Sequence, residues 1–401
     1  MVKVLVIGGG YGGLRTVESL SKYEDVEVTL VDQNPYHYLQ TEAYGYIAGK
    51  FDVNDIAIDL SNWSLGFERV KFLQTTVTSV DFENRCIDYK DEKIFFDYVV
   101  IGIGAKTNFF SFIEGLRENS YGVKSLYRAF NFRKEFEELI YQKLQTREGE
   151  SSDELNIAIG GAGLSGVEVA AEMAYVIKNY SKTIGNRAND IKIYLIDASD
   201  TILPGTSKYI IKNTTKRLQV LGVKILTNAF ISKVDSSSIH FKNGEELDYS
   251  FMVFTGGIKA SDLNEAIKSE KNRIDQLIVD KTLNVPGYKN VFAIGDCIEM
   301  RDERGNILPP TAQSAERSAE YVAKAIRSRI DNAEPEIFHA SVMGMFVALG
   351  GKYAVGEVFT FIKVRGSMAF FLKKAITYAY YIGLRLRINT GFKNRVRNRD
   401  I

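Results

Sequence analysis

Residues 157–168 read IAIGGAGLSGVE, an apolar run in which Gly161, Gly163 and Gly166 have the spacing G-x-G-x-x-G. In a dinucleotide-binding fold such glycines permit a tight turn, a close approach of the backbone to pyrophosphate, and close packing of helix on strand. The phosphates lie at the helix N-terminus, where free N–H groups and the helix dipole favour an anion. The stretch therefore predicts a strand, a phosphate-binding turn and a helix.

The same spacing occurs earlier in the chain, in VIGGGYGG, where Gly8, Gly10 and Gly13 follow the apolar run VKVLVI. Each copy leads into a predicted helix and then into a second apolar run that ends in an acid, Asp32 or Asp197. Such a carboxylate accepts hydrogen bonds from the ribose hydroxyls of a dinucleotide. One copy alone is a weak signal, whereas two copies in the same βαβ context predict two nucleotide sites.

The rest of the chain repeats this architecture and predicts an α/β fold with two Rossmann-like dinucleotide-binding domains. The glycine-ended runs FFDYVVIGIGA and SFMVFTGG follow the two units, and NVFAIGD is a further buried strand. A helix is predicted over 124–146, and the polar residues 146–154 are typical of a linker. The expected domains are 1–120 with 280–345, then 121–279, and a C-terminal region of 346–401.

Composition excludes several classes of protein. At 401 residues, with 45% apolar and 25% charged residues, the chain is long enough for two or three folded domains. Two cysteines and three histidines are too few for a disulfide framework or a metal cluster, so no metal site is predicted. We see no secretory signal and no run of about 18 apolar residues, and therefore expect a cytoplasmic body without a membrane span.

Two dinucleotide sites in one chain predict one tightly held redox cofactor and one that exchanges, which indicates FAD and NADH. Asp197 would repel a 2′-phosphate, and the stretch DASDTIL that begins with it holds no Arg or Lys. The second site is therefore expected to prefer NADH to NADPH. Hydride transfer between the two groups needs proximity and stacking rather than an acid or a base.

The sequence resembles the two-dinucleotide-binding flavoproteins and, within them, the type II NADH:quinone oxidoreductases, which are NADH dehydrogenases that pump no protons. The resemblance covers nearly the whole chain and is carried by IGGGYGG, VDQNPYHY, DYVVIGIGA, GGAGLSGVEVAAEMA, TILPG, FTGGI, VFAIGDC, PPTAQ and FLKK. It implies that the first domain binds FAD, that the second binds NADH, and that a membrane quinone accepts the electrons.

The resemblance also implies the residues of both sites. Asp296 would hold the flavin ribityl chain, and the helix that starts at TAQ would direct its N-terminus at the flavin, where it stabilises negative charge. The candidate FAD-binding residues are Gly8, Gly10, Gly13, Asp32, Gly104, Asp296, Thr311 and Ala312. The candidate NADH-binding residues are Gly161, Gly163, Gly166, Asp197 and Gly256.

Glu168 is the first candidate catalytic residue. It matches a glutamate that the family places at the junction of nicotinamide and flavin, and we expect it, with Lys373, to handle charge and protons during quinone reduction. The alternative is a carboxylate that the helix N-terminus stabilises by about 0.3–1 kcal/mol without any catalytic role.

The quinone side departs from the family pattern of Ala-Gln, three residues, then Gln. Gln313 matches the first glutamine and would orient the quinone, whereas Arg317 replaces the second. Arg317 either donates to a quinone carbonyl or forms a surface salt bridge with Glu316 or Glu320.

The C-terminal region is basic, since residues 366–401 hold eight Lys or Arg against Asp400 alone, in a chain with a net charge of +1. Apolar residues recur on one helical face, at Phe371, Ala375, Tyr378, Ile382 and Leu386. Basic residues fall on the opposite arc, at Lys373, Lys374, Arg385 and Arg387. Such a helix is typical of a segment that lies in an anionic membrane surface.

We therefore predict a peripheral protein on the cytoplasmic side of the cell membrane, expected as a homodimer. A helix that packs in the core or in a dimer is the alternative for the tail. No recognition motif or stacking platform accompanies the charges, so nucleic-acid binding is not predicted.

Three other functions stay open. A soluble NADH-dependent reductase of a small redox protein and a flavin-bearing sensor both fit the two sites. A relative of the sulfide:quinone oxidoreductases is disfavoured because YHYLQTEAYGYIAG, where disulfide reductases carry their cysteine pair, has none. Cys86 and Cys297 are isolated, and we predict that both are structural.

Overall fold

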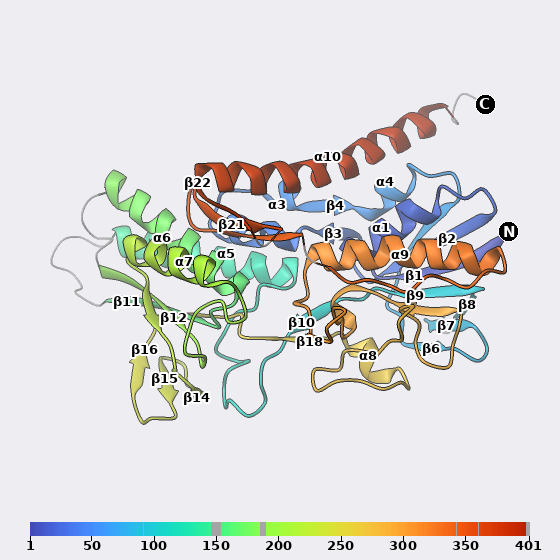
Figure 1. Ribbon diagram of the computed structural model, residues 1–401. Helices are drawn as coiled ribbons and strands as arrows, with labels where there is room; N and C mark the ends of the chain where they lie inside the picture. The colour runs from blue at the N-terminus through green and yellow to red at the C-terminus, as the bar shows by residue number, and fades with distance from the viewer. Residues whose placement is uncertain (91, 146–153, 185–189, 342, 360, 398–401) are drawn as a thin grey trace.

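Two parallel sheets form the frame of the molecule in the computed structural model (Figure 1). The structure describes the chain except for residues 91, 146–153, 185–189, 342, 360 and 398–401. All of the predicted linker except Glu154 therefore lies outside the described residues. The α/β prediction is confirmed, because helices flank both sheets.

The first sheet has the strand order β19-β9-β1-β2-β5 and is parallel throughout. Its strands are β1 (Val2–Ile7), β2 (Val26–Asp32), β5 (Val70–Gln74), β9 (Tyr98–Ile101) and β19 (Val291–Ala293). Helices α1 (Tyr11–Leu20) and α9 (Ala312–Ile330) pack against each other beside it. Continuous apolar runs suit this sheet because helices and loops cover both of its faces.

The second sheet has the order β13-β12-β11-β17 and is also parallel. Its strands are β11 (Leu155–Gly160), β12 (Ile191–Ile196), β13 (Lys224–Leu226) and β17 (Phe251–Phe254). Its helices are α5 (Leu126–Gln145), α6 (Leu164–Ile184) and α7 (Lys208–Leu221). Pairing of β11 with β12 runs over six residues, as does the pairing of β1 with β2, so the two βαβ units share one geometry.

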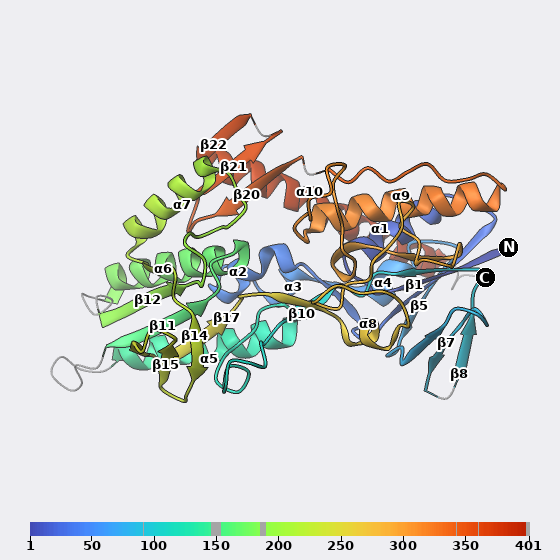
Figure 2. The same ribbon diagram turned by 60° about the horizontal axis from the view of Figure 1, so that its bottom comes forward.

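A short antiparallel pair, β10 (Ala105–Thr107) and β18 (Ile258–Ala260), links segments that follow the two sheets. Smaller hairpins lie at opposite ends of the molecule (Figure 2). One end holds β6 (Ser79–Asp81), β7 (Cys86–Tyr89) and β8 (Glu92–Phe95), and the other holds β14 (Ile231–Val234), β15 (Ser238–Phe241) and β16 (Glu246–Asp248). The predicted turn FKNGEEL joins β15 to β16.

Short elements complete the first half between β2 and β5. They are β3 (Tyr36–Tyr38), the 3-10 turn η1 (Gln40–Glu42), α2 (Ala43–Ile47), α3 (Val53–Ile56), β4 (Ala57–Asp59) and α4 (Leu60–Ser64). Two more, α8 (Asp262–Ala266) and η3 (Gly295–Cys297), lie further along the chain.

The C-terminal region folds back over both halves. The antiparallel strands β20 (Gly344–Ala348), β21 (Ala354–Val358) and β22 (Ile362–Gly366) lead into α10 (Ser367–Arg397), which packs against β21, β22 and α4. Helix α10 runs along one side of the molecule from the second half to the first (Figure 1). Among the described residues, no helix has both the length and the apolar character needed to cross a bilayer.

Candidate functional site

A cavity of 1590 Å³ opens between the two halves and below α10. It is larger than the roughly 300–1,000 Å³ that is usual for a small-molecule site. The predicted site residues that line it are Gly8, Gly10, Asp32, Gly104, Glu168, Asp296, Thr311, Ala312, Gln313, Arg317 and Lys373. The structure therefore brings the first fingerprint, the start of α6, the start of α9 and α10 to one place.

The first glycine loop is shaped for close contact with a ligand. Gly8 has a φ of +109°, and a Cβ on it would collide with the Gly102 carbonyl. A Cβ on Gly13 would collide with the Gly8 carbonyl, whereas Gly10 has nothing within 4 Å of its Cβ position and faces the cavity. The backbone at Gly10 is thus open to a phosphate, as the motif requires.

Asp32 is the last residue of β2, and its carboxylate binds the backbone of this loop. Its Oδ2 accepts from the Gly9 N–H at 2.6 Å, and its Oδ1 accepts from the Asn34 N–H at 2.7 Å. Burial raises the pKa of this carboxyl above its usual value, and the two backbone N–H groups oppose that shift. The carboxylate lines the cavity, where a ribose hydroxyl of a bound dinucleotide would donate to it.

The second glycine loop repeats this geometry. Gly161 has a φ of +98°, and a Cβ on it would collide with the Gly256 backbone. A Cβ on Gly166 would collide with the Gly161 carbonyl, whereas a Cβ on Gly163 would have no atom within 4 Å. Asp197 accepts from the Ala162 N–H at 2.6 Å and from the Ser199 N–H at 2.7 Å. The cavity reaches this unit at Leu164, Ser165 and Glu168, beside the loop.

The N-terminus of α9 faces the cavity through Ala312. Thr311 caps the helix, because its Oγ1 accepts from the Ser314 N–H at 3.2 Å while the Ser314 Oγ accepts from the Thr311 N–H at 3.0 Å. Nearby, the Asp296 carboxylate lies 3.4 Å from the Lys124 ammonium. The Asp296 carboxylate is thus balanced by Lys124, and the N-terminus of α9 favours negative charge at this end of the cavity.

Glu168 and Lys373, which are 205 residues apart, form a buried ion pair in the cavity wall. The Glu168 Oε1 also accepts from the Ala348 N–H at 2.8 Å. The two side chains are only 12% and 11% exposed. Burial raises the pKa of Glu168 above its usual value, although the Lys373 ammonium and the Ala348 N–H oppose the shift.

Gln313 and Arg317 both bind the segment that precedes β20. The Gln313 Oε1 accepts from the Met343 N–H at 3.0 Å. Arg317 donates to the Ser341 carbonyl at 2.9 Å and also to the Ser341 hydroxyl. Both residues line the cavity while they hold this segment in place.

The alternative for Arg317, a salt bridge to Glu316 or Glu320, is wrong. Both glutamates pair instead with Arg15 on α1, at 3.1 and 3.3 Å. The Arg15 side chain extends from α1 to the two carboxylates on α9. The Arg317 side chain points toward Ser341 instead. The helix spacing alone did not indicate a cation supplied by another helix.

Sequence reasoning missed a buried aromatic cluster behind the first glycine loop. The His37 Nδ1 donates to the Gly9 carbonyl at 3.0 Å, which leaves Nε2 to accept from the Tyr380 hydroxyl at 3.1 Å. Burial lowers the pKa of His37 to about 4, so the ring is neutral. Tyr11 packs edge-on to His37. The only available signal was one histidine between two tyrosines in an apolar strand.

Helix α10 has the predicted two faces, but its basic face is turned inward. Lys373 pairs with Glu168, Lys374 pairs with Glu42, and Arg385 donates to the Asn54 carbonyl at 2.6 Å. The Arg387 guanidinium stacks 4.4 Å from the centre of the Phe67 ring. Buried carboxylates, a backbone carbonyl and an aromatic ring therefore bind these four cations, which lie on the side of α10 that faces the protein.

The apolar face of α10 is exposed. Phe371 is 58% exposed, Tyr378 63% and Leu386 59%, and Ala375 is exposed with them; Ile382 is half-buried. Side chains from residue 389 onward, including the basic residues Lys393, Arg395, Arg397 and Arg399, lie outside the described part of the chain.

Both cysteines are buried and unpaired, in agreement with a structural role. The Cys297 Sγ donates weakly to the Ile294 and Ile101 carbonyls, and burial raises the pKa of this thiol to about 12. A thiol with such a pKa is a poor redox nucleophile. In the part of the chain that the structure describes, no group of His, Cys, Asp or Glu has the arrangement of a metal site.

The whole sequence was compared with known proteins. Residues 2–321 match the pyridine nucleotide-disulphide oxidoreductase family. The type II NADH:quinone oxidoreductase of Staphylococcus aureus strain MSSA476 is 30% identical over 389 residues, which cover 93% of this chain and 94% of that protein. This chain belongs to the type II NADH:quinone oxidoreductase family.

Solved structures share the fold of this chain. NDH2 from Plasmodium falciparum, solved in complex with NADH, has a TM-score of 0.84 at 21% identity over 98% of this chain and 97% of its own. The sulfide:quinone oxidoreductase of Aquifex aeolicus has a TM-score of 0.81 at 20% identity over 99% of this chain and 94% of its own. At such identities the likeness concerns the fold alone.

Proposed function

We propose that this protein oxidises NADH through a bound FAD and reduces a membrane quinone without pumping protons. One observation carries the proposal: a single cavity is bordered by the first glycine loop from Gly8 to Gly12, by the start of the second dinucleotide helix, and by the N-terminus of α9. Two dinucleotides bound from these two sides would meet end to end, which is what hydride transfer between them requires.

FAD would occupy the first half, residues 1–120 and 280–345. Gly8, Gly10 and Gly13 would hold its pyrophosphate and Asp32 its ribose, while Gly104, Asp296, Thr311 and Ala312 would border the rest. NADH would occupy the second half, residues 121–279, on Gly161, Gly163, Gly166, Asp197 and Gly256. When bound there, FAD would supply the redox chemistry that couples oxidation of NADH to reduction of the quinone by two electrons.

Glu168 and Lys373 are the proposed proton-handling pair. Oxidation of NADH by a quinone consumes one proton from solvent for each quinol formed, because the hydride carries only one hydrogen. A buried carboxylate beside a lysine, with its pKa raised by burial, is suited to hold and release that proton in the cavity. Gln313 and Arg317 would shape the quinone side of the cavity through the segment that they hold.

The proposed activity has a direct test. The purified protein should be yellow, NADH should bleach its flavin absorbance under anaerobic conditions, and a short-chain quinone should restore the colour. Failure to bleach would refute the enzyme; reoxidation by a small redox protein such as rubredoxin, but not by quinones, would favour the soluble reductase instead.

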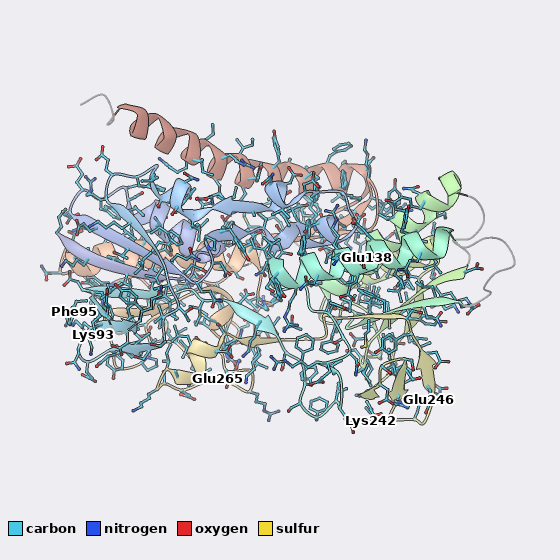
Figure 3. All side chains as sticks on the ribbon, turned by 180° about the vertical axis from the view of Figure 1, so that it is seen from behind. Lys93, Phe95, Glu138, Lys242, Glu246 and Glu265 are labelled. Carbon is cyan, nitrogen blue, oxygen red and sulfur yellow. The ribbon has the colours of Figure 1, made fainter. Side chains whose placement is uncertain are left out.

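The same proposal places the protein peripherally on the cytoplasmic side of a membrane, with the outer face of α10 against the lipid. That face carries Ile376, which is 61% exposed, and Phe361 in the connection between β21 and β22 is 71% exposed. Large exposed apolar patches commonly mark interaction surfaces. The labelled charged residues Lys93, Lys242, Glu246 and Glu265 lie on the side away from α10 (Figure 3).

Surface substitutions test the membrane contact better than truncation, because removal of α10 would also remove Lys373 and Lys374. Phe361→Ser with Ile376→Ser should move the protein from sedimenting liposomes to the supernatant while the flavin stays bound. The control changes two other exposed aromatic residues, Tyr127→Ser and Tyr141→Ser on α5, and should leave sedimentation unchanged. Equal sedimentation of all variants would refute the lipid contact. Analytical ultracentrifugation of the purified protein without liposomes tests the expected homodimer.

A further inference from the structure

A second buried ion pair lies beside the first, and the proposed function does not use it. Lys373 and Lys374 are adjacent on α10 but reach different carboxylates: Lys373 pairs with Glu168, and Lys374 with Glu42, at 2.5 Å. Glu42 ends the turn η1 and its side chain is 7% exposed. A carboxylate this deep is rare unless it is paired, and here its partner comes from 332 residues away.

Tyr44 lies between the two pairs. The Lys373 ammonium is 4.7 Å and the Lys374 ammonium 6.0 Å from the centre of the Tyr44 ring. The Tyr44 hydroxyl and the Glu42 Oε1 are both buried without a hydrogen-bond partner, and the two residues are two positions apart in the chain. Burial and the carboxylates of Glu42, Glu168 and Glu172 raise the pKa of Tyr44 well above its usual value, so the hydroxyl keeps its proton.

The two pairs differ in what they face. Glu168, Lys373 and Tyr44 line the cavity, whereas Glu42 and Lys374 lie behind that wall. The Lys374 side chain is 26% exposed, against 11% for Lys373, so the outer pair reaches solvent and the inner pair reaches the cavity. This order, from solvent to cavity, is what proton delivery to the inner pair requires.

A third pair of the same kind, Glu172 with Lys50, provides a contrast. Glu172 is one helical turn beyond Glu168, and its side chain is 1% exposed. Its lysine stacks over Tyr175, at 5.3 Å, and donates to the Gly351 carbonyl at 3.4 Å, so this pair fastens the β20–β21 turn. Glu42 is among the groups that raise the pKa of Glu168.

We infer that Glu42 and Lys374 form an outer proton relay that resupplies Glu168 and Lys373. The inference rests on the proposed quinone reduction. In each turnover the inner pair gives one proton to a quinone oxygen, the outer pair replaces it, and the outer pair regains a proton from solvent at Lys374. The electrons and the other hydrogen come from NADH, so the relay carries the single solvent proton of the reaction.

The relay can be isolated by stopped-flow measurement of the two half-reactions. In Glu42→Gln holoenzyme, bleaching by NADH should keep the wild-type rate, whereas reoxidation by a short-chain quinone should slow about tenfold. The solvent deuterium isotope effect on reoxidation should rise, and a small weak acid such as imidazolium should restore the rate. Glu42→Asp should retain most of it.

Glu172→Gln is the matched control, since it neutralises a buried carboxylate that is paired with Lys50 and belongs to neither of the two pairs, and its reoxidation rate should stay within about twofold of wild type. Lys374→Gln repeats the test if Glu42→Gln does not fold, with the same expected result. Wild-type reoxidation in these variants, or a slower rate with an unchanged isotope effect and no rescue by weak acid, would overturn the relay. Wild-type protein that NADH does not bleach would instead overturn the proposed function.

Discussion

The two glycine loops share a backbone geometry, but the position two residues after the third glycine carries opposite charges in the two copies. Gly8 and Gly161 have φ values of +109° and +98°, and Asp32 and Asp197 each accept from a loop N–H at 2.6 Å. Two residues after the third glycine, however, the first copy has Arg15 and the second has Glu168. Both side chains line the cavity.

The partners of these two residues explain the difference. Arg15 pairs with Glu18 on its own helix and with Glu316 and Glu320 on α9, so it fastens the helix whose N-terminus faces the cavity. Glu168 pairs with Lys373 and accepts from the Ala348 N–H, both of which belong to the C-terminal region. The two copies thus share the geometry of the phosphate-binding loop, while the residue after it pairs with α9 in the first copy and with the C-terminal region in the second.

The largest effect is expected where a side chain enters either loop. Gly13→Val and Gly166→Val each drive a side chain into a loop carbonyl, and each should lower turnover by more than about 100-fold, a loss of roughly 3 kcal/mol in binding or orientation. Gly13→Val should purify without flavin colour, whereas Gly166→Val should stay yellow and fail to bleach with NADH. If both variants lost flavin, the division of ligands between the loops would be wrong.

Neutralising Glu168 or Arg15, the oppositely charged residues that follow the two loops, is expected to give the next largest difference in turnover. Glu168→Gln should lower quinone reduction about 100-fold, within the range typical of a lost acid or base, with flavin still bound. Arg15→Gln should instead lower Tm by a few degrees and change turnover only a few-fold, because its ion pairs are partly exposed. Comparable turnover in the two variants, measured with the same quinone, would contradict the separate roles.

The two aspartates allow a milder comparison. Asp197→Asn removes the negative charge of a carboxylate that accepts two short hydrogen bonds from backbone N–H groups. It should raise KM for NADH about tenfold, equivalent to about 1.4 kcal/mol, without loss of flavin. Asp32→Asn should loosen FAD and leave KM for NADH near wild type. Steady-state kinetics with flavin quantified after gel filtration separates the two outcomes.

The last comparison concerns stability against pH rather than turnover, and it involves His37, which donates to the Gly9 carbonyl of the first loop. Its pKa falls from 6.5 when unfolded to about 4 when folded, so the unfolded chain binds more protons between these values. Stability from the neutral ring is complete above pH 6.5 and is lost as pH falls toward 4, by up to about 3 kcal/mol. Tm measured from pH 7 to pH 5 should fall less steeply in His37→Gln than in wild type; parallel curves would rule out this account.

Most of the frame could be predicted because its signals are local. Buried parallel strands read as continuous apolar runs, and glycine spacing and terminal acids mark the turns, so β1, β2, β11 and β12 follow from short windows of sequence. The two faces of α10 follow from helical periodicity in the same way. Periodicity states which residues share a face, but it does not state which face meets the protein.

What only the tertiary structure decided is which distant groups meet. The inward turn of the basic face of α10 depends on buried carboxylates at Glu42 and Glu168, hundreds of residues away, whose charge must be compensated once they leave water. In the same way, Arg15 on α1 pairs with Glu316 and Glu320 on α9, and Arg317 therefore donates to Ser341 instead of pairing with those glutamates. The sequence by itself determined two nucleotide-binding loops and their terminal acids, because these depend on neighbouring residues. The pairing of charges around the cavity depends on burial, and burial is a property of the packed fold.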